Sequence, residues 1–337
     1  MQLTARIAMA LRRPCLAVVA LLGGCIGPLA AGAAPAEPTY PARPIHVIVP
    51  QAAGGTVDLL TRMLGERVET MFGVAFVVDD KPGANGIIGN EAAKRAPPDG
   101  YTLLAASTAT HVMTPHVVSN LSYDPLQDFV PVINLARQTK VILVSSALSV
   151  ATVGELVALA RRRPGQLNFA STGVGSSSHL DTAQLEALTG MELVHIPYRG
   201  SAQTVAALTA NEVQVLLASV TAAMPAVASG RVRALAVMAD RRSPLLPDVP
   251  TMVEAGLPRF DAVTWLGFLA PAGTPTAIID NLNHMLNRIL QSPDTRAWLE
   301  KQGLEPVGGS RESFDLEIRA DLDKWGKVAR RLGIRPQ

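Results

Sequence analysis

The sequence predicts an α/β fold with largely parallel sheets, and three observations lead to it. Short apolar runs typical of buried strands alternate with amphipathic helical patterns along nearly the whole chain after residue 40. At two places a strand-like run passes through glycines and hydroxyl residues directly into a helical pattern. The chain of 337 residues, 48% of them hydrophobic, is long enough to form two domains around separate cores.

The alternation starts with the apolar run Ile45–Val49, which leads into a helical pattern carrying Leu60, Met63 and Leu64 on one side. The turn residues Pro97–Gly100 introduce a later strand. The elements expected in this part are the strands Ile45–Val49, Val74–Val78, Thr102–Ala106, Phe129–Asn134 and Lys140–Ser145, and the helices Asp58–Met71, Asn85–Arg95 and Thr152–Arg162.

The second part continues the same pattern and then breaks it. The proline-rich segment Ser243–Pro258 interrupts the alternation, and a late apolar run follows it, which indicates that the chain returns to its first domain near residue 260. The elements expected here are the strands Leu167–Ala170, Glu192–Ile196, Val213–Leu217, Ala234–Met238 and Trp265–Ala270, and the helices Ser178–Thr189, Gln203–Ala210, Thr221–Ser229, Pro275–Leu290 and Phe314–Arg331.

Two strand-to-helix loops have the composition of anion-binding sites. The first is Gln51–Asp58, which contains two consecutive glycines, and the second is Ser171–Ser178, which is rich in glycine and serine. Such residues leave backbone N–H groups accessible beside the positive end of the helix dipole. Two loops of this kind, facing each other across a cleft, are expected to hold a carboxylate without any catalytic group.

Residues 1–36 have the pattern of a secretory signal peptide. Three arginines within residues 6–13 are accompanied by no acid, Cys15–Ile26 form an apolar core, and Ala30–Ala36 offer small residues for cleavage. The apolar run is shorter than the roughly 20 residues of a membrane span. Leu22–Cys25 also resembles a lipoprotein box, so lipid attachment at this cysteine is the alternative to simple cleavage.

Cys15 and Cys25 are the two cysteines of the chain, and both lie within the predicted signal. A cleaved protein would have no disulfide, thiolate metal site or cysteine nucleophile. Loss of the three signal arginines would change the formal charge from +2 to −1. The basic run Arg161–Arg163 reads as a solvated helix end, and a nucleic-acid partner is therefore not expected.

Two enzymatic interpretations are weaker than the binding one. Gly173-x-Gly175-x-x-Ser178 resembles a dinucleotide fingerprint, but the next predicted strand does not end in the acid that this fingerprint needs. Ser177 and His179 suggest a serine hydrolase, yet the chain has no Gly-x-Ser-x-Gly elbow. The serines are better explained as caps of the following helix.

Metal binding is also not expected. The histidines show no ligand spacing on one helix or strand face, and no group of carboxylates accompanies them. These histidines are His46, His111, His116, His179, His195 and His284.

Eight segments of the sequence together resemble the substrate-binding proteins of tripartite tricarboxylate transporters, the Bug family of extracytoplasmic solute receptors. The resemblance runs from Tyr40 to about Ile334. The matching segments are Tyr40-Pro41-x-Arg43-Pro44-Ile45, Ala53-Gly54-Gly55-x-x-Asp58, Lys81-Pro82-Gly83-Ala84, Pro98-Asp99-Gly100-Tyr101-Thr102, the loop Ser171–Leu180, Pro197-Tyr198-Arg199-Gly200, Leu246-Pro247-Asp248-Val249-Pro250-Thr251 and Ala270-Pro271-Ala272-Gly273-Thr274-Pro275.

The resemblance implies a type II periplasmic-binding-protein fold, with two α/β domains joined by a hinge and a ligand cleft between them. Residues 37–138 and 259–337 would form the first domain, and residues 139–258 the second. Backbone amides of the two loops would hold a small carboxylate, with Ser107 and Tyr198 at the sides of the cleft. The ligand-binding residues expected on this basis are Ala53, Gly54, Gly55, Thr56, Asp58, Ser107, Ser171, Thr172, Gly173, Gly175, Ser176, Ser177, His179 and Tyr198.

The same resemblance implies a periplasmic, non-enzymatic receptor with no cofactor and no metal. It would bind its ligand as a monomer and present it to a membrane permease. A receptor that delivers its ligand to a sensor kinase and a secreted serine hydrolase are the alternatives. Relatives often carry an acid after the strand equivalent to Val213–Leu217, but Ala218-Ser219-Val220 provide none here. An unsubstituted mono- or dicarboxylate, or a neutral aromatic or amide relative of one, is therefore expected rather than an amino acid.

Overall fold

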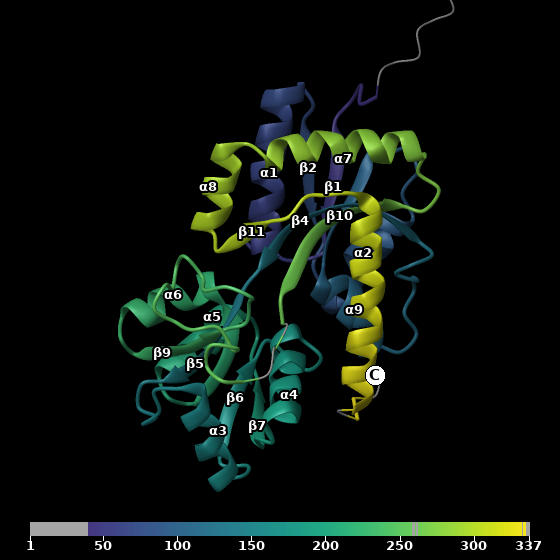
Figure 1. Ribbon diagram of the computed structural model, residues 1–337. Helices are drawn as coiled ribbons and strands as arrows, with labels where there is room; N and C mark the ends of the chain where they lie inside the picture. Colours follow the sequence, from purple (N-terminus) through teal and green to yellow (C-terminus); the bar gives the residue numbers. More distant parts are fainter. Residues whose placement is uncertain (1–39, 258–259, 261, 332, 335–337) are drawn as a thin grey trace, which may run out of the picture. The chain divides into compact units, whose positions relative to one another are not determined.

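The computed structural model describes residues 40–257, 260, 262–331 and 333–334. The predicted signal segment, with Cys15 and Cys25, lies outside the described residues. Within the described part of the chain, no helix is both long and apolar enough to span a bilayer. Two β-sheets organise these residues, and helices cover both of them (Figure 1).

The larger sheet has six strands in the order β11-β4-β10-β3-β1-β2. We call this sheet and its helices the first domain. Helices α1 and α7 pack on one face of the sheet, and α2 and α9 pack on the other. The elements are β1 (Ile45–Val49), α1 (Thr56–Phe72), β2 (Phe76–Asp80), η1 (Ala84–Gly86), α2 (Ile87–Lys94), β3 (Thr102–Ser107), the π-helical turn η2 (Thr108–Met113), η3 (Thr114–His116), β4 (Phe129–Gln138), β10 (Thr264–Pro271), α7 (Thr276–Leu290), α8 (Pro293–Lys301), β11 (Leu304–Pro306) and α9 (Arg311–Arg331).

The smaller sheet has five strands in the order β7-β6-β8-β5-β9, and we call it and its helices the second domain. Helices α3 and α4 contribute to the core on one face, and α5 and α6 to the core on the other. The elements are β5 (Lys140–Ser145), α3 (Val153–Arg162), β6 (Leu167–Ser171), α4 (Ser177–Thr189), β7 (Leu193–Pro197), α5 (Ser201–Thr209), β8 (Val215–Ser219), α6 (Val220–Ala228) and β9 (Val232–Val237).

The prediction of largely parallel sheets is wrong, because both sheets are mixed. Strand β1 is parallel to β2 and β3, and β6 is parallel to β7 and β8, as expected for strands joined through helices. In contrast, β10 is antiparallel to β3 and β4, and β5 is antiparallel to β8 and β9. Both exceptions are strands that enter a sheet from the other domain, so no helical crossover within the same sheet sets their direction.

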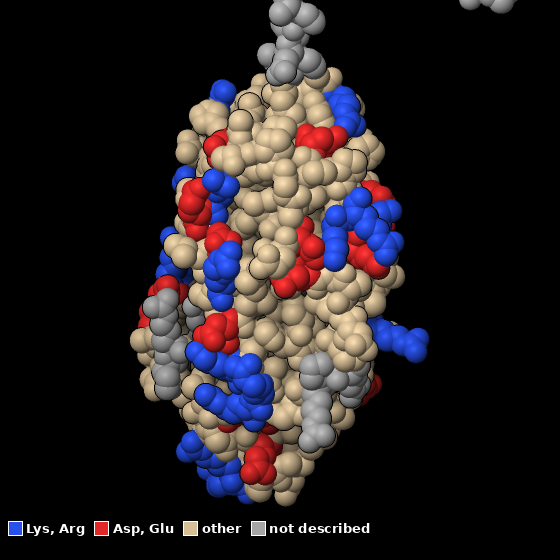
Figure 2. Space-filling model, turned by 90° about the vertical axis from the view of Figure 1, so that its right-hand side faces the viewer, with Lys and Arg blue, Asp and Glu red and all other residues tan. Residues whose placement is uncertain are grey.

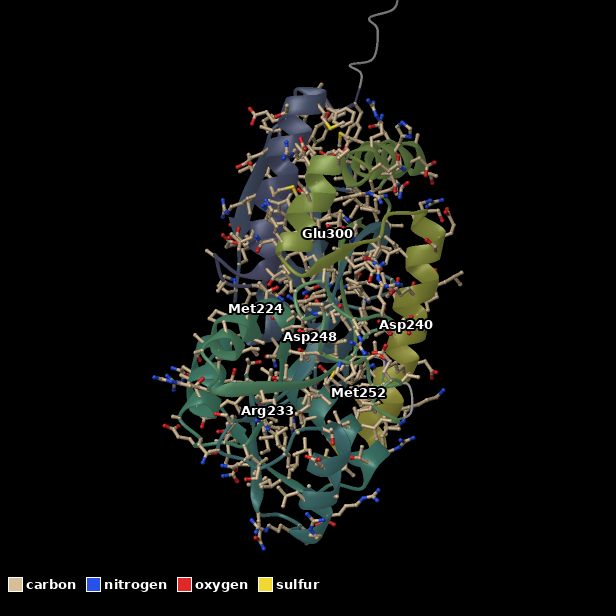
Figure 3. The ribbon with its side chains drawn as sticks, turned by 60° about the vertical axis from the view of Figure 1, so that its left-hand side comes forward. Met224, Arg233, Asp240, Asp248, Met252 and Glu300 are labelled. Atoms are coloured by element: carbon tan, nitrogen blue, oxygen red, sulfur yellow. The ribbon has the colours of Figure 1, made fainter. Side chains whose placement is uncertain are left out.

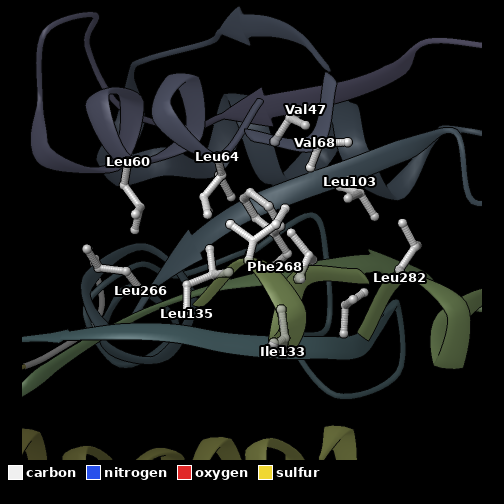
Figure 4. Packing of buried hydrophobic residues seen from close by; sticks show 14 of the residues in the cluster. Val47, Leu60, Leu64, Val68, Leu103, Ile133, Leu135, Leu266, Phe268 and Leu282 are labelled. Carbon is white, nitrogen blue, oxygen red and sulfur yellow. The ribbon is translucent and has the colours of Figure 1, made fainter. Parts of the chain in front are cut away.

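The core of the first domain shows how the helical pattern becomes packing. Leu60, Leu64 and Val68 recur at four-residue spacing along α1 and point toward Leu103 and Phe268 of the sheet (Figure 4). All five side chains are at most 1% exposed. Full burial of such a side chain contributes about 1.5–3 kcal/mol. This packing holds the beginning of α1, and the loop before it, against the sheet.

The two domains are connected by chain crossings and by packing. Strand β4 ends at Gln138 and β5 begins at Lys140, so Thr139 alone separates the two sheets at the first crossing. The chain enters the first sheet again with β10 at Thr264. In addition, Leu180 of α4 is fully buried in a cluster with Trp265 and Trp325 of the first domain.

Most of the expected elements occur, with some differences in their bounds. The strand expected at Val74–Val78 lies at Phe76–Asp80, because the left-handed Gly73 ends α1 and the pairing with β1 begins at Phe76. Helix α8, strand β11 and the turn η2 were not expected. In α8, Leu299 is the one apolar residue that is fully buried, so the sequence of this helix has no strong apolar stripe to predict it. Strand β11 has only three residues, which is too short for a clear pattern.

Candidate ligand-binding site

A cavity of about 480 Å³ lies between the two domains. The first domain contributes the loop before α1, the end of β3, the end of β4 and the end of α8. The second domain contributes the first residues of α4 and α5 and the region around the start of α6. Its polar lining residues are Gln51, Thr56, Ser107, Gln138, Ser177, Ser201, Ser219, Thr221, Thr264 and Gln302.

A second cavity of about 120 Å³ adjoins the first on the side of the second domain. The two cavities share the lining residues Gln138, Ser177, Ser201, Ser219 and Ala222, so they are immediate neighbours. We call the larger one the main cavity and the smaller one the inner cavity. The inner cavity adds further polar lining residues, namely Lys140, Thr172, Ser178 and Thr204.

The first loop presents an uncapped helix N-terminus to the main cavity. Gly55 is the N-cap of α1, and no side chain caps the helix there. Gly54 has a φ of +78°, which glycine adopts without strain, and its N–H donates to Asp58 Oδ2 at 2.7 Å. Gly54, Gly55, Thr56 and the adjoining Val57 all line the cavity. The positive end of a 17-residue helix therefore faces the space between the domains.

The second loop uses much of its backbone hydrogen-bonding capacity internally. The N–H of Gly173 donates to Ser171 Oγ at 3.0 Å, and the N–H of Thr172 donates to Ser178 Oγ at 3.1 Å. The N–H of Gly175 donates to His179 Nδ1 at 3.1 Å. These bonds hold the loop in a fixed shape at the start of α4.

His179 and His195 contact this second loop through their ring nitrogens. The rings of His179 and His195 stack with their centroids 4.0 Å apart, and Phe169 stacks on His195 at 4.9 Å. Ser171 Oγ lies 2.5 Å from His195 Nε2. Burial lowers the pKa of His179, and burial together with the neighbouring His179 lowers the pKa of His195 to about 4. Both shifts favour the neutral form of the imidazole, which suits two rings stacked at this distance.

The structure brings about half of the expected site residues to the two cavities. Gly54, Gly55, Thr56, Ser107 and Ser177 line the main cavity, and Ser177 and Thr172 line the inner one. The others lie beside or beneath the loops, outside the residues that line these two cavities, namely Ala53, Asp58, Ser171, Gly173, Gly175, Ser176, His179 and Tyr198.

Two of these outer residues have clear structural partners. Asp58 is buried beneath the first loop, where it accepts the Gly54 N–H and forms an ion pair with Arg62 at 2.6 Å. Burial and a hydrogen bond with Glu212 raise the pKa of Tyr198, whose ring packs against the core of the second domain. Both residues therefore have bonds that do not depend on a ligand.

Several cavity residues were missed by the sequence interpretation. Gln138 ends β4 and donates from Nε2 to Thr56 Oγ1 at 3.2 Å. Ser219 ends β8 and caps α6 through the N–H of Ala222 at 3.4 Å. A polar residue at the end of an apolar strand was the available signal for both. Trp298 and Gln302 had no such signal, because α8 itself was not expected.

The arrangement of helices favours an anion. Ser177, Ser201 and Ser219 lie at the N-terminal ends of α4, α5 and α6, and all three line both cavities. Together with α1, four helix N-termini point toward the same space, each with a partial positive charge. Among the described residues that line the two cavities, Lys140 is the one with a charge. The lining therefore offers donors to an anion and no carboxylate to a cation.

A third cavity of about 460 Å³ lies at another part of the domain border. It contains none of the expected site residues, and its lining is strongly charged, with the ion pair between Arg241 and Glu305 at 2.6 Å. Asp240 and Met252, labelled in Figure 3, come from the segment that follows β9. On the face shown in Figure 2, acidic and basic side chains lie next to one another in several groups, with uncharged residues between the groups.

Comparisons with known proteins agree with this geometry. The model of the tripartite tricarboxylate transporter family receptor matches residues 60–334. Protein BugT of Bordetella pertussis is 34% identical over 319 residues, which cover 94% of this chain and 98% of that protein. Two solved structures are similar as well. R. palustris Rpa4515 with adipate has a TM-score of 0.80 at 34% identity, over 88% of this chain and all of that one. MatC from Rhodopseudomonas palustris with bound malate has a TM-score of 0.75 at 29% identity, over 86% of this chain and 99% of that one.

Proposed function

The chain belongs to the tripartite tricarboxylate transporter receptor family, and we propose that it captures a small carboxylate between its two domains and presents it to a membrane permease. Family membership confirms the resemblance seen in the eight sequence segments and the two-domain α/β fold. The family consists of periplasmic solute receptors, so this chain is a receptor and not an enzyme.

The convergence of four helix N-termini on one space carries the proposal of an anionic ligand. Adipate and malate, the ligands of two structural neighbours, are small carboxylates. An amino acid would bring an ammonium group that needs an acidic partner, and the cavity residues of the described chain include none. The ligand is therefore a carboxylate without an amino group.

Binding in this scheme closes the cleft. The crossing at Thr139 and the return before Thr264 connect the two domains, and rotation about these segments would enclose a ligand. The domains would comprise residues 37–138 with 259–337 and residues 139–258, in a monomer. Export would depend on the signal in residues 1–36, with Cys25 as the alternative site of lipid attachment. Delivery to a sensor kinase in place of a permease remains the alternative downstream step.

A thermal-shift screen against small carboxylates, followed by calorimetry, tests the proposal. A ligand that binds only the folded state at 100 times its Kd stabilises it by about 2.7 kcal/mol. A clear hit among mono- or dicarboxylates supports the receptor function. A folded protein that responds to no carboxylate, or that prefers glutamate or aspartate, contradicts it.

Gly55→Val tests the place of binding. The φ of Gly55 is −74°, so the backbone tolerates a side chain there, but its Cβ would lie 3.1 Å from the carbonyl oxygen of Ala52 and would obstruct the N-terminus of α1. Gly154→Val in α3 is the control, because its nearest neighbour lies 3.9 Å from the added Cβ and the residue is remote from the cavities. Only Gly55→Val should weaken binding, and normal binding by this variant would contradict the assigned site.

A further inference from the structure

The main cavity is lined by chemically different side chains in the two domains. Among the described residues that line it, every large apolar side chain belongs to the first domain, whereas the second domain contributes small residues that mostly carry hydroxyls. The first group is Val57, Leu59, Leu266, Trp298 and Leu304, and the second group is Ser177, Ser201, Ser219, Thr221 and Ala222. The small residues of the second domain leave free the space that the apolar residues border.

Two of the apolar residues supply the accessible apolar surface. Val57, Leu266 and Leu304 are at most 4% exposed, because they belong to the core of the first domain. In contrast, Leu59 in the first turn of α1 is 44% exposed, and Trp298 of α8 is only partly buried at the edge of the same core. We call Leu59 and Trp298 the apolar wall of the main cavity.

Trp298 lies on a helix whose end is fixed at the border between the domains. Leu299 anchors α8 in the core of the first domain, where it is fully buried. The carbonyl oxygen of Gln302, one turn after Trp298, accepts a hydrogen bond from Thr221 Oγ1 of the second domain. A Cβ on the following Gly303 would lie 2.7 Å from the same hydroxyl. The indole ring is therefore placed beside the cavity before any ligand binds.

The apolar wall favours a particular kind of ligand body. An indole ring offers a large apolar surface, and it pairs well with a second ring in an offset-stacked or edge-to-face arrangement. No charged residue occurs among the described residues that line the main cavity. A ligand that buries apolar surface against Leu59 and Trp298 thus gains hydrophobic stabilisation there, whereas a hydroxylated body gains less and loses water.

We propose that Leu59 and Trp298 are the specificity-determining residues of the main cavity, and that they select a carboxylate carrying an apolar ring over an acid with a polar body. This inference rests on the proposed receptor function and specifies the ligand class of the same site. The helix N-termini attract the carboxylate of any acid, so they do not discriminate between ligand bodies. Discrimination comes from the apolar wall.

Tryptophan fluorescence tests the contact directly. The chain has three tryptophans, and Trp265 and Trp325 are at most 2% exposed, so quenching by acrylamide reports mainly on Trp298. Phenylacetate that covers one face of this ring should lower the quenching constant about twofold. Acetate, which has the carboxylate without the ring, should leave it unchanged. Bound phenylacetate that gives no protection overturns the proposed contact.

Calorimetry with phenylacetate and malate tests the selectivity. The unmodified protein should bind phenylacetate about tenfold more tightly than malate, and Trp298→Ala should remove this preference by weakening phenylacetate binding. Leu59→Ala should weaken phenylacetate binding about threefold. Leu316→Ala is the matched control, because this leucine of α9 is 69% exposed and lies outside the cavity lining, so its replacement should change neither affinity.

Trp298→Leu covers the case in which the alanine variant does not fold, because leucine keeps an apolar contact with the core while the ring is lost. It should lower the ratio of the two affinities about threefold. An unchanged ratio in a folded Trp298 variant, or a preference of the unmodified protein for malate, overturns the role of the apolar wall and leaves the receptor function intact. If neither these two acids nor any carboxylate of the thermal-shift screen binds, both proposals are overturned.

Discussion

Replacing Asp58 by asparagine is expected to loosen the loop before α1 and to weaken ligand binding together. The Asp58 carboxylate is 3% exposed and accepts the Gly54 N–H at 2.7 Å. This bond fixes the left-handed Gly54 just before the uncapped N-terminus of α1. Loss of the negative charge therefore acts on the backbone that lines the main cavity, although Asp58 itself does not line it.

The magnitude follows from the two partners of the carboxylate. A hydrogen bond to a charged group contributes about 1.5–3 kcal/mol, and a neutral one about half as much, so asparagine retains part of the Gly54 bond. Arg62 is 48% exposed and keeps Asp80 as a partner at 2.8 Å, so its ion pair adds at most about 1 kcal/mol. We expect a loss of about 1–2 kcal/mol of unfolding free energy and a three- to tenfold weaker affinity.

Urea unfolding and calorimetry with the best carboxylate of the screen measure the two effects. Glu155→Gln is a matched control, because Glu155 in the first turn of α3 accepts the Ala151 N–H at 2.6 Å with the same four-residue spacing. The control should lose some stability and no affinity, since α3 does not line either cavity. If Asp58→Asn loses stability but binds as tightly as the unmodified protein, the first loop does not hold the ligand.

Three further changes test the packing and the histidine stack. Gly267→Ala in β10 should lower the unfolding free energy by about 3 kcal/mol, because the added Cβ would clash with the Phe314 ring and lie 2.7 Å from the carbonyl oxygen of Ile133, and a loss under 1 kcal/mol in urea unfolding would refute this. Leu180→Ala should cost about 2–5 kcal/mol by the same measurement, since this α4 side chain is fully buried in the first domain, and a near-neutral effect would show that the domains do not pack there. Stability should also fall as the pH drops from about 6.5 to about 4, because the folded-state pKa of His195 is lowered to about 4 and the unfolded chain binds its proton first. His195→Phe should make this fall shallower in unfolding titrations, and an identical pH profile would contradict the stack.

Much of the fold could be predicted because its elements are encoded locally. The four-residue spacing of Leu60, Leu64 and Val68 determines which side of α1 is buried, whichever sheet it meets. The glycines of the first loop likewise predict a strand that turns directly into a helix. In contrast, α8 is mostly polar and β11 has three residues, so both are weakly marked in the sequence. They depend on tertiary contacts, because β11 pairs with β4 and α8 packs against β11 and α7.

The candidate site was predictable only in part. Gly54, Gly55 and Thr56 belong to one local motif, and their place at a helix N-terminus follows from the sequence nearby. Gln138, Ser219 and Gln302 come from three distant segments, and no local pattern relates them to that motif. The composition of Ser171–Ser178 predicted backbone N–H groups that are free to bind a ligand. In the structure, side chains of this loop and of the adjacent His179 accept several of these N–H groups.

By itself, the sequence determined the alternation of strands and helices, the two glycine- and serine-containing loops and the family to which the chain belongs. The tertiary structure decided that β5 and β10 run antiparallel to their neighbours and that four helix N-termini meet at one space. It also decided that Lys140, an ordinary residue of an apolar run in the sequence, forms a buried ion pair with Asp181 beside that space. The physical reason is that side-chain periodicity reports only which face of an element is buried, whereas strand order and the domain crossings determine which distant residues face one another.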